Sequence, residues 1–199
     1  MATKKGQLVK TSLEKYSRPR SNGINAITIK EGDELLEAKL TTGNSQILMS
    51  VKSGKCIRFE ESKTRPMGRN ASGVRGVRLK DDNDEVVGML SVNDMDSDIL
   101  VVSENGYGKR TSQKDFRLTN RGGKGIIGIV NSKRNGNTTS SFPVFEGDEV
   151  VISTNKGRLI RTSVKEIRIA GRNTQGVRII KLSGDEKVVS AFKIDDNLL

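Results

Sequence analysis

A repeat of about 50 residues constrains the fold of this chain more than any other feature of its sequence. One series of glycines follows β-rich apolar segments at intervals of 48, 52 and 51 residues: Gly6, Gly54, Gly106 and Gly157. A second series ends polar loops at intervals of 50, 52 and 51 residues: Gly23, Gly73, Gly125 and Gly176. Two series with nearly the same period predict four structural repeats, with approximate bounds 1–42, 43–93, 94–145 and 146–199.

Each repeat contains the elements of a small antiparallel sheet. It opens with an apolar segment such as 46–51, 98–103 or 149–154, and a glycine turn leads to a short cationic strand. A loop then ends at one of the second series of glycines, which we call the closing loop and the closing glycine. Apolar residues follow the closing glycine at +1 and +4 in every repeat, and at +6 in all but the third, where Asn131 stands. This spacing predicts a strand with a bulge or sharp bend.

An acidic turn and a final strand, such as 86–90 or 188–192, complete the unit. The third repeat carries a longer insertion at this point, from 131 to 141. About four strands per repeat are typical of a propeller blade. We therefore predict one all-β domain spanning 1–199, a propeller-like array of about four four-stranded blades.

The composition restricts the classes of function. The net charge is +11 with no histidine, and Cys56 is the only cysteine. Intrachain disulfides, Cys/His metal sites and histidine-based catalysis are therefore excluded, while the charge favours a polyanionic partner. We predict no cofactor. No apolar run reaches the length of a membrane span and the first residues lack a signal peptide, so we expect a cytoplasmic protein.

The charges follow the repeat. From residue 52 to 78 there are eight cations and two acids, whereas from 80 to 98 there are one cation and seven acids. This separation predicts a basic rim on the array of blades. The candidate contacts are the cations of the closing loops, the cations of the adjoining strands and the glycines of the third loop: Arg18, Arg20, Arg58, Arg69, Arg75, Arg78, Lys109, Arg110, Arg121, Gly122, Gly123, Lys124, Gly125, Arg158, Arg161, Arg172 and Arg178.

The expected ligand is double-stranded DNA bound with little sequence preference. Aromatic residues make up only 4% of the chain, which disfavours base stacking on single strands, and no recognition helix is predicted. Two other interpretations remain: a propeller whose basic face binds an acidic protein, and an enzyme. The enzyme interpretation has only Tyr16, Tyr107 and Cys56 to offer, with no neighbouring base in the sequence.

One loop and three further segments resemble a known family. Arg121-Gly-Gly-Lys-Gly125 resembles the core of the gyrase A box, Gln-Arg-Arg-Gly-Gly-x-Gly, although Thr119 and Asn120 replace its first two residues. The segments 67–78, 105–111 and 171–178 are similar to the C-terminal domain of the DNA gyrase A protein.

The resemblance implies a β-pinwheel, a propeller variant whose blades exchange strands, which wraps DNA around a basic outer rim. It also implies that the chain is the C-terminal portion of a larger polypeptide, which works with the rest of gyrase A and with gyrase B in ATP-dependent supercoiling near the nucleoid. The catalytic tyrosine of strand passage lies in a separate region in that family, so we expect this domain to be non-catalytic. The corresponding domain of topoisomerase IV is the alternative within the family.

Overall fold

The computed structural model describes residues 1–92 and 96–194, and these residues form four small antiparallel sheets. From the centre of the molecule outward, the first sheet consists of β3 (Leu35–Glu37), β1 (Ala2–Thr3), β2 (Gln7–Leu8) and β6 (Val74–Arg75), and the second of β7 (Val86–Val92), β4 (Gln46–Val51), β5 (Lys55–Glu60) and β10 (Ile126–Ile127). In the same order, the third sheet consists of β11 (Thr138–Val144), β8 (Asp98–Ser103), β9 (Tyr107–Ser112) and β14 (Val177–Arg178). The fourth sheet consists of β15 (Val188–Lys193), β12 (Glu149–Thr154) and β13 (Leu159–Ser163). The predicted all-β, propeller-like architecture is confirmed.

Helical structure in the described residues is limited to single 3₁₀ turns after the second strand of each repeat: η1 (Leu13–Tyr16), η2 (Glu61–Lys63), η3 (Gln113–Asp115) and η4 (Val164–Glu166). None of the described helices is long and apolar enough to cross a membrane.

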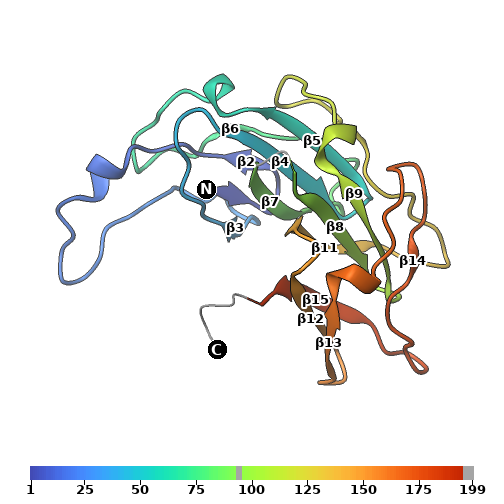
Figure 1. Ribbon diagram of the computed structural model, residues 1–199. Helices are drawn as coiled ribbons and strands as arrows, with labels where there is room; N and C mark the ends of the chain where they lie inside the picture. Colours follow the sequence, from blue (N-terminus) through green and yellow to red (C-terminus); the bar gives the residue numbers. More distant parts are fainter. Residues whose placement is uncertain (93–95, 195–199) are drawn as a thin grey trace.

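The four blades follow one another along an arc, with the first and fourth at its two ends (Figure 1). The final strand of each repeat is the innermost strand of its blade, so β3, β7, β11 and β15 face a common centre. These four strands line a shared cavity of about 530 Å³. The outer edge of the arc is consequently formed by the strands at the opposite side of each sheet.

The outermost strand of each of the first three blades comes from the following repeat. β6 pairs with β2 through Gln7↔Arg75, β10 pairs with β5, and β14 pairs with β9 through Tyr107↔Arg178. Each of these strands covers only positions +1 and +2 after the closing glycine, and the backbone bends at +3. The bend returns the next apolar residue, such as Val77, to the core, which confirms the bend predicted from the irregular apolar spacing.

The closing glycine allows this exchange. Gly73 and Gly176 have φ of +86° and +77°, a region that favours glycine. A Cβ atom at either position would lie 2.6 Å from a backbone oxygen of the accepting strand, that of Leu8 or Gly108. Only a residue without a side chain lets the exchanged strand approach its partner this closely.

The first and fourth repeats differ from the two between them. The segment 24–29 was predicted to be a strand but forms none, because in the described part of the chain no earlier blade offers it a partner strand. For the matching reason the fourth blade has three strands, and β13 forms its outer edge. The first opening strand is also short, covering only Ala2–Thr3.

The hydrophobic cores lie between neighbouring blades. One cluster joins Leu48 and Leu90 of the second blade to Ile99 and Phe116 of the third repeat. The central strands β4 and β8 are buried on both faces after their first residue, whereas β12 of the fourth blade alternates between buried and partly buried positions. Continuous apolar segments are the sequence expected for strands covered on both faces.

Candidate nucleic-acid interface

The closing loops lie along the outer edge of the arc and are hydrogen-bonded to one another. The amide at +5 after one closing glycine donates to the carbonyl at −2 before the next, at 2.8 to 3.1 Å. The three bonds of this kind are Thr28 N to Ala71 O, Arg78 N to Gly123 O and Val130 N to Thr174 O. The four loops thereby form one continuous line, which we call the closing-loop track (residues 17–30, 67–80, 119–130 and 170–181).

An arginine four residues before each of the last three closing glycines reinforces the track. Arg69, Arg121 and Arg172 donate from NH1 to the carbonyl at +2 of the preceding repeat, at distances between 2.8 and 3.0 Å. Arg121 also donates from Nε to the carbonyl of Lys63 at 2.9 Å. These guanidinium groups are half-buried and oriented, and within the described residues none forms a salt bridge with a carboxylate. Each is therefore a fixed cation whose charge is not neutralised by a neighbouring acid.

A second group of cations along the track is exposed and likewise has no salt bridge within the described residues. It consists of Arg18, Arg20, Arg75, Arg78, Lys124, Arg178 and Lys181. The salt bridges found in the described chain involve other cations, such as Lys4 with Glu34 and Lys156 with Asp185. Positive charge without local compensation is thus concentrated on the outer edge, which favours binding of an extended polyanion.

The three glycines of the third closing loop have different surroundings. Gly122 has φ of +80° and its amide donates to the Gly76 carbonyl at 2.6 Å. Gly125 packs against the Cys56 backbone, so both of these glycines allow close packing of backbone segments within the protein. Gly123 is exposed beside the exposed Lys124, and this pair offers an unobstructed surface to a ligand.

Three predicted contact residues are buried, and the structure corrects their assignment to the surface. Arg58, Lys109 and Arg110 are 5%, 0% and 6% exposed. Arg58 donates to the carbonyls of Gln113 and Phe116 at 2.8 and 3.1 Å. These side chains lie on strands covered by the neighbouring blade, and they fasten blades to one another.

Arg110 and Lys109 both hold the segment that precedes β14. Arg110 donates from Nε to the carbonyl of Ile167 at 2.7 Å. Lys109 donates from Nζ to the carbonyls of Gly171 and Arg172, both at 2.6 Å, and to the Thr174 hydroxyl at 3.1 Å. Burial lowers the pKa of Lys109 to about 8. The fourth closing loop is therefore anchored from below by a buried ammonium group.

In the fourth repeat Arg161, which corresponds to Arg58 and Arg110, is exposed because no blade covers β13 in the described chain, and Arg158 just before β13 is exposed as well. Arg161 is paired with Glu149, and Arg158 lies 3.0 Å from Glu186 while donating to the Lys181 carbonyl at 2.7 Å. Both predicted contacts are thus accessible, but their charge is partly compensated.

Sequence reasoning missed exposed arginines at one further repeat position. The arginines two residues after the end of η2, η3 and η4 are exposed, and none has a salt bridge within the described residues: Arg65, Arg117 and Arg168. Their spacing of 52 and 51 residues repeats the period of the closing glycines, so the period itself could have revealed them.

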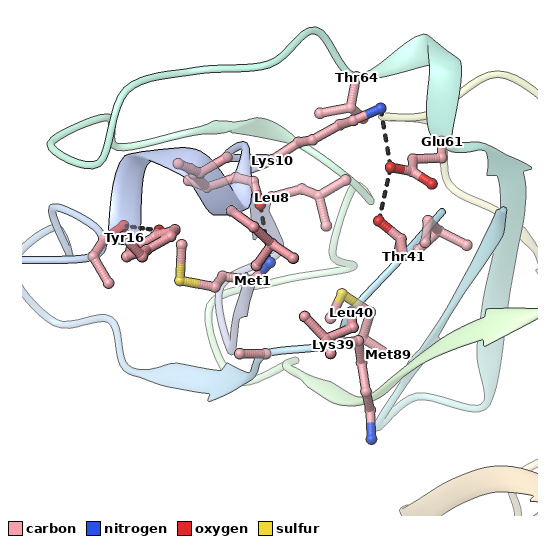
Figure 2. Close-up of a pocket in the computed structure, with 16 residues that line it drawn as sticks. Met1, Leu8, Lys10, Tyr16, Lys39, Leu40, Thr41, Glu61, Thr64 and Met89 are labelled. Atoms are coloured by element: carbon pink, nitrogen blue, oxygen red, sulfur yellow. Dashed lines mark hydrogen bonds and ion pairs between the residues drawn. The ribbon is translucent and has the colours of Figure 1, made fainter. Parts of the chain in front are cut away.

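A separate apolar cavity of about 440 Å³ lies between the first and second repeats (Figure 2). Thr64 faces it at the repeat position that Phe116 and Ile167 fill elsewhere, and among the described residues the Thr64 hydroxyl has no hydrogen-bond partner. The cavity thus follows from a small residue at a position otherwise occupied by a large one.

The charged groups at this cavity are already paired with each other. Figure 2 shows Lys10 beside Glu61, at 3.0 Å, and the Thr41 hydroxyl donating to the same carboxylate at 2.7 Å. Away from this cavity, Cys56 is buried, and burial raises the pKa of its thiol to about 12, so the thiol stays protonated. Within the described residues no cluster of acids, cysteine or histidine has the composition of a metal site.

Comparisons with known proteins agree with this geometry. The sequence matches the family model described as the DNA gyrase C-terminal domain, beta-propeller, over residues 1–42, 49–93, 97–140 and 148–195. The DNA gyrase A protein of Chlamydia pneumoniae is 41% identical over 99% of this chain, and that of Pseudomonas aeruginosa is 43% identical over 98%. The chain covers only 24% and 21% of these two relatives.

Two solved structures share the fold. The C-terminal domain of DNA topoisomerase IV superposes with a TM-score of 0.91 at 24% identity, over 98% of this chain and 60% of that chain. The DNA gyrase A C-terminal domain superposes with a TM-score of 0.85 at 25% identity, over 98% and 64%.

Proposed function

This chain belongs to the DNA gyrase C-terminal domain family, and from that premise we propose that it is a non-catalytic module that binds duplex DNA and bends it around the outer edge of its blades. The observation that carries the proposal is the closing-loop track, a hydrogen-bonded line of loops with arginine and lysine side chains that no carboxylate neutralises within the described residues.

The track suits the phosphate backbone for a physical reason. Each cation that contacts a phosphate releases a condensed counterion, and this entropy gain does not depend on base sequence. Smooth bending of a short duplex by 40–90° costs on the order of 1–6 kcal/mol. A handful of phosphate contacts spread along an arc offsets that cost, and the hydrogen bonds between loops fix the cations in advance.

In the parent protein the module would act with the remainder of gyrase A and with gyrase B, in the cytoplasm at the bacterial chromosome. Its contribution would be to present a bent duplex to the ATP-dependent strand-passage machinery. Topoisomerase IV is the alternative parent, and the sequence identities above favour gyrase.

The salt dependence of duplex binding tests the proposal. If six or more phosphates are contacted, log K for an unlabelled mixed-sequence duplex should fall against log salt with a slope of about −5 or steeper. Lys124→Gln should reduce the magnitude of the slope by about 1 and weaken binding equally on unrelated sequences. Lys39→Gln is the matched control, because Lys39 lies at the central cavity and pairs with Glu37 at 2.8 Å.

A topology assay separates bending from binding. A plasmid relaxed in the presence of the protein should shift in linking number if the duplex is wrapped. A slope near zero would favour a propeller that binds an acidic protein, and binding without a shift in linking number would refute the wrapping part of the proposal.

A further inference from the structure

The insertion in the third repeat brings Arg134 to Tyr107, where Arg178 of the closing-loop track also lies. The Arg134 guanidinium carbon lies 4.8 Å from the centre of the Tyr107 ring, and that of Arg178 lies 5.5 Å from it. Arg178 also donates from NH2 to the Tyr107 hydroxyl at 3.0 Å. Tyr107 itself is only 6% exposed, whereas both arginines are exposed.

Neither arginine is neutralised by an acid of the described chain. Within residues 1–92 and 96–194 no salt bridge is found for Arg134 or Arg178. Hydrogen bonding to both arginines, and to a smaller degree their positive charge, lowers the pKa of the Tyr107 hydroxyl. Two guanidinium groups gathered at one ring repel each other unless an anion lies between or beside them.

The insertion that carries Arg134 is held rigidly. The side chain of Asn135 is fully buried and accepts hydrogen bonds from Ser132 N and Ser132 Oγ at 2.8 and 3.0 Å. It donates to the carbonyls of Val130 and Gln175 at 3.0 and 3.1 Å. The Asn105 side chain donates to the carbonyl of Arg134 itself at 3.1 Å.

This network fixes the backbone at Arg134 and joins the insertion to the fourth closing loop, since Gln175 directly precedes Gly176. A cation whose backbone and ring contact are fixed loses less conformational freedom on binding than a free surface arginine.

Within this cluster, Arg134 adds a cation that lies outside the closing-loop track. The fourth closing loop runs beside the end of β9, where Ala170 N donates to the Arg110 carbonyl at 2.9 Å. Tyr107 begins β9, at the turn formed by residues 103–106. The cluster therefore lies at the turn side of the third blade.

We propose that Arg134 and Arg178, positioned by Tyr107, form a phosphate subsite that binds a backbone phosphodiester of duplex DNA and draws the duplex toward the turn side of the third blade. The planar guanidinium groups suit the oxygens of a phosphodiester, with which arginine forms paired hydrogen bonds. The subsite rests on the proposed function, because it extends the same DNA contact. No other repeat has the insertion, so the subsite is unique within the chain.

The test compares Arg134→Gln with Lys39→Gln, which removes the same charge at the central cavity. Arg134 is exposed, so its replacement should leave the urea unfolding curve unchanged. The expected result is a slope of log K against log salt that is smaller in magnitude by about 0.9. When salt is lowered from 1 M to 0.1 M, the affinity of the variant for duplex should therefore rise about eightfold less than that of the unchanged chain. Lys39→Gln should keep the slope of the unchanged chain.

The outcomes separate the two proposals. Equal slopes for Arg134→Gln and Lys39→Gln would overturn the subsite while leaving DNA binding along the track intact. If the unchanged chain does not bind duplex at low salt, the proposed function fails and the subsite fails with it. If only Arg134→Gln lowers the slope, and does so on unrelated sequences, the subsite is supported.

Discussion

Replacing a closing glycine with alanine tests whether strand exchange holds the blades together, and the chain supplies its own control. Gly73 and Gly23 occupy the same repeat position with φ of +86° and +78°. A Cβ atom at Gly73 would lie 2.6 Å from the Leu8 oxygen and 2.8 Å from a methyl carbon of Val9. A Cβ atom at Gly23 would meet nothing within 4 Å.

The two substitutions share one cost and differ in another. The left-handed backbone costs alanine about 1–2 kcal/mol at either position, less about 0.4–1 kcal/mol from the stiffer unfolded chain. At Gly73 the clash adds about 1–3 kcal/mol of overpacking, because the obstructing atoms include backbone. Displacement of β6 would also weaken the bond from Gly76 N to the Gly6 carbonyl, 2.8 Å long and worth about 1 kcal/mol.

We therefore expect Gly23→Ala to lower the free energy of unfolding by about 1 kcal/mol and Gly73→Ala to lower it by about 3 kcal/mol or more. Urea unfolding followed by circular dichroism measures both losses, and the comparison is valid if the two variants have equal m-values. Equal losses for the two variants would refute the reasoning, since they would mean that β6 does not press against β2 through its closing glycine.

Three further predictions concern buried polar groups. Thr64→Val removes a buried hydroxyl that has no hydrogen-bond partner in the described part of the chain, and it should raise the free energy of unfolding by about 1 kcal/mol. Thr111→Val removes a hydroxyl that donates to the Ala170 carbonyl and should lower the free energy of unfolding by about 1 kcal/mol; thermal unfolding distinguishes these signs. Arg110→Met should cost about 3 kcal/mol, because it leaves the Ile167 carbonyl and the partly buried Asp98 carboxylate without the guanidinium group. Arg161→Met, at the exposed equivalent position, should cost less than about 1 kcal/mol, and similar costs for the two variants would contradict the blade-fastening role. The pKa of Lys109 falls from an ordinary 10.5 to about 8 in the folded state, so the unfolded state binds more protons between these pH values and stability should rise with pH there. Relative to Lys109→Met, the gain should reach up to about 3 kcal/mol, and a flat difference from pH 8 to 10.5 would exclude the shift.

The sequence predicts the strands well because their residues carry a local pattern. The segment 46–51 is apolar throughout most of its length, and it forms β4, which neighbouring blades cover on both faces. The position of the bend after each closing glycine is likewise encoded in the apolar spacing around Val77. The family resemblance predicted strand exchange, but the residues alone did not, because the partners β2 and β6 are separated by more than a whole repeat.

The candidate interface was harder to predict, because burial of a cation is decided by the neighbouring blade. Arg110 follows Lys109 and Arg121 follows Asn120, and both arginines lie in basic segments of the sequence. In the structure, however, Arg110 is 6% exposed, whereas Arg121 reaches the outer edge. The equivalence of Arg110 with Arg161 is visible in the repeat, but their different exposure depends on whether a further blade is present. Arg134 was missed because the insertion that carries it interrupts the period.

The exchanged strands also determine how this molecule comes apart. In most repeat proteins the stability is the sum of an intrinsic contribution from each unit and a contribution from each contact between neighbours. Here each of the first three blades is completed by a strand from the following repeat. Much of the free energy of sheet formation therefore comes from contacts between neighbouring repeats. Melting one repeat removes the outer strand of the blade before it and the core of the blade after it. Such coupling favours concerted unfolding over progressive fraying, and it would let tension from a bent duplex at one blade be shared by the whole arc.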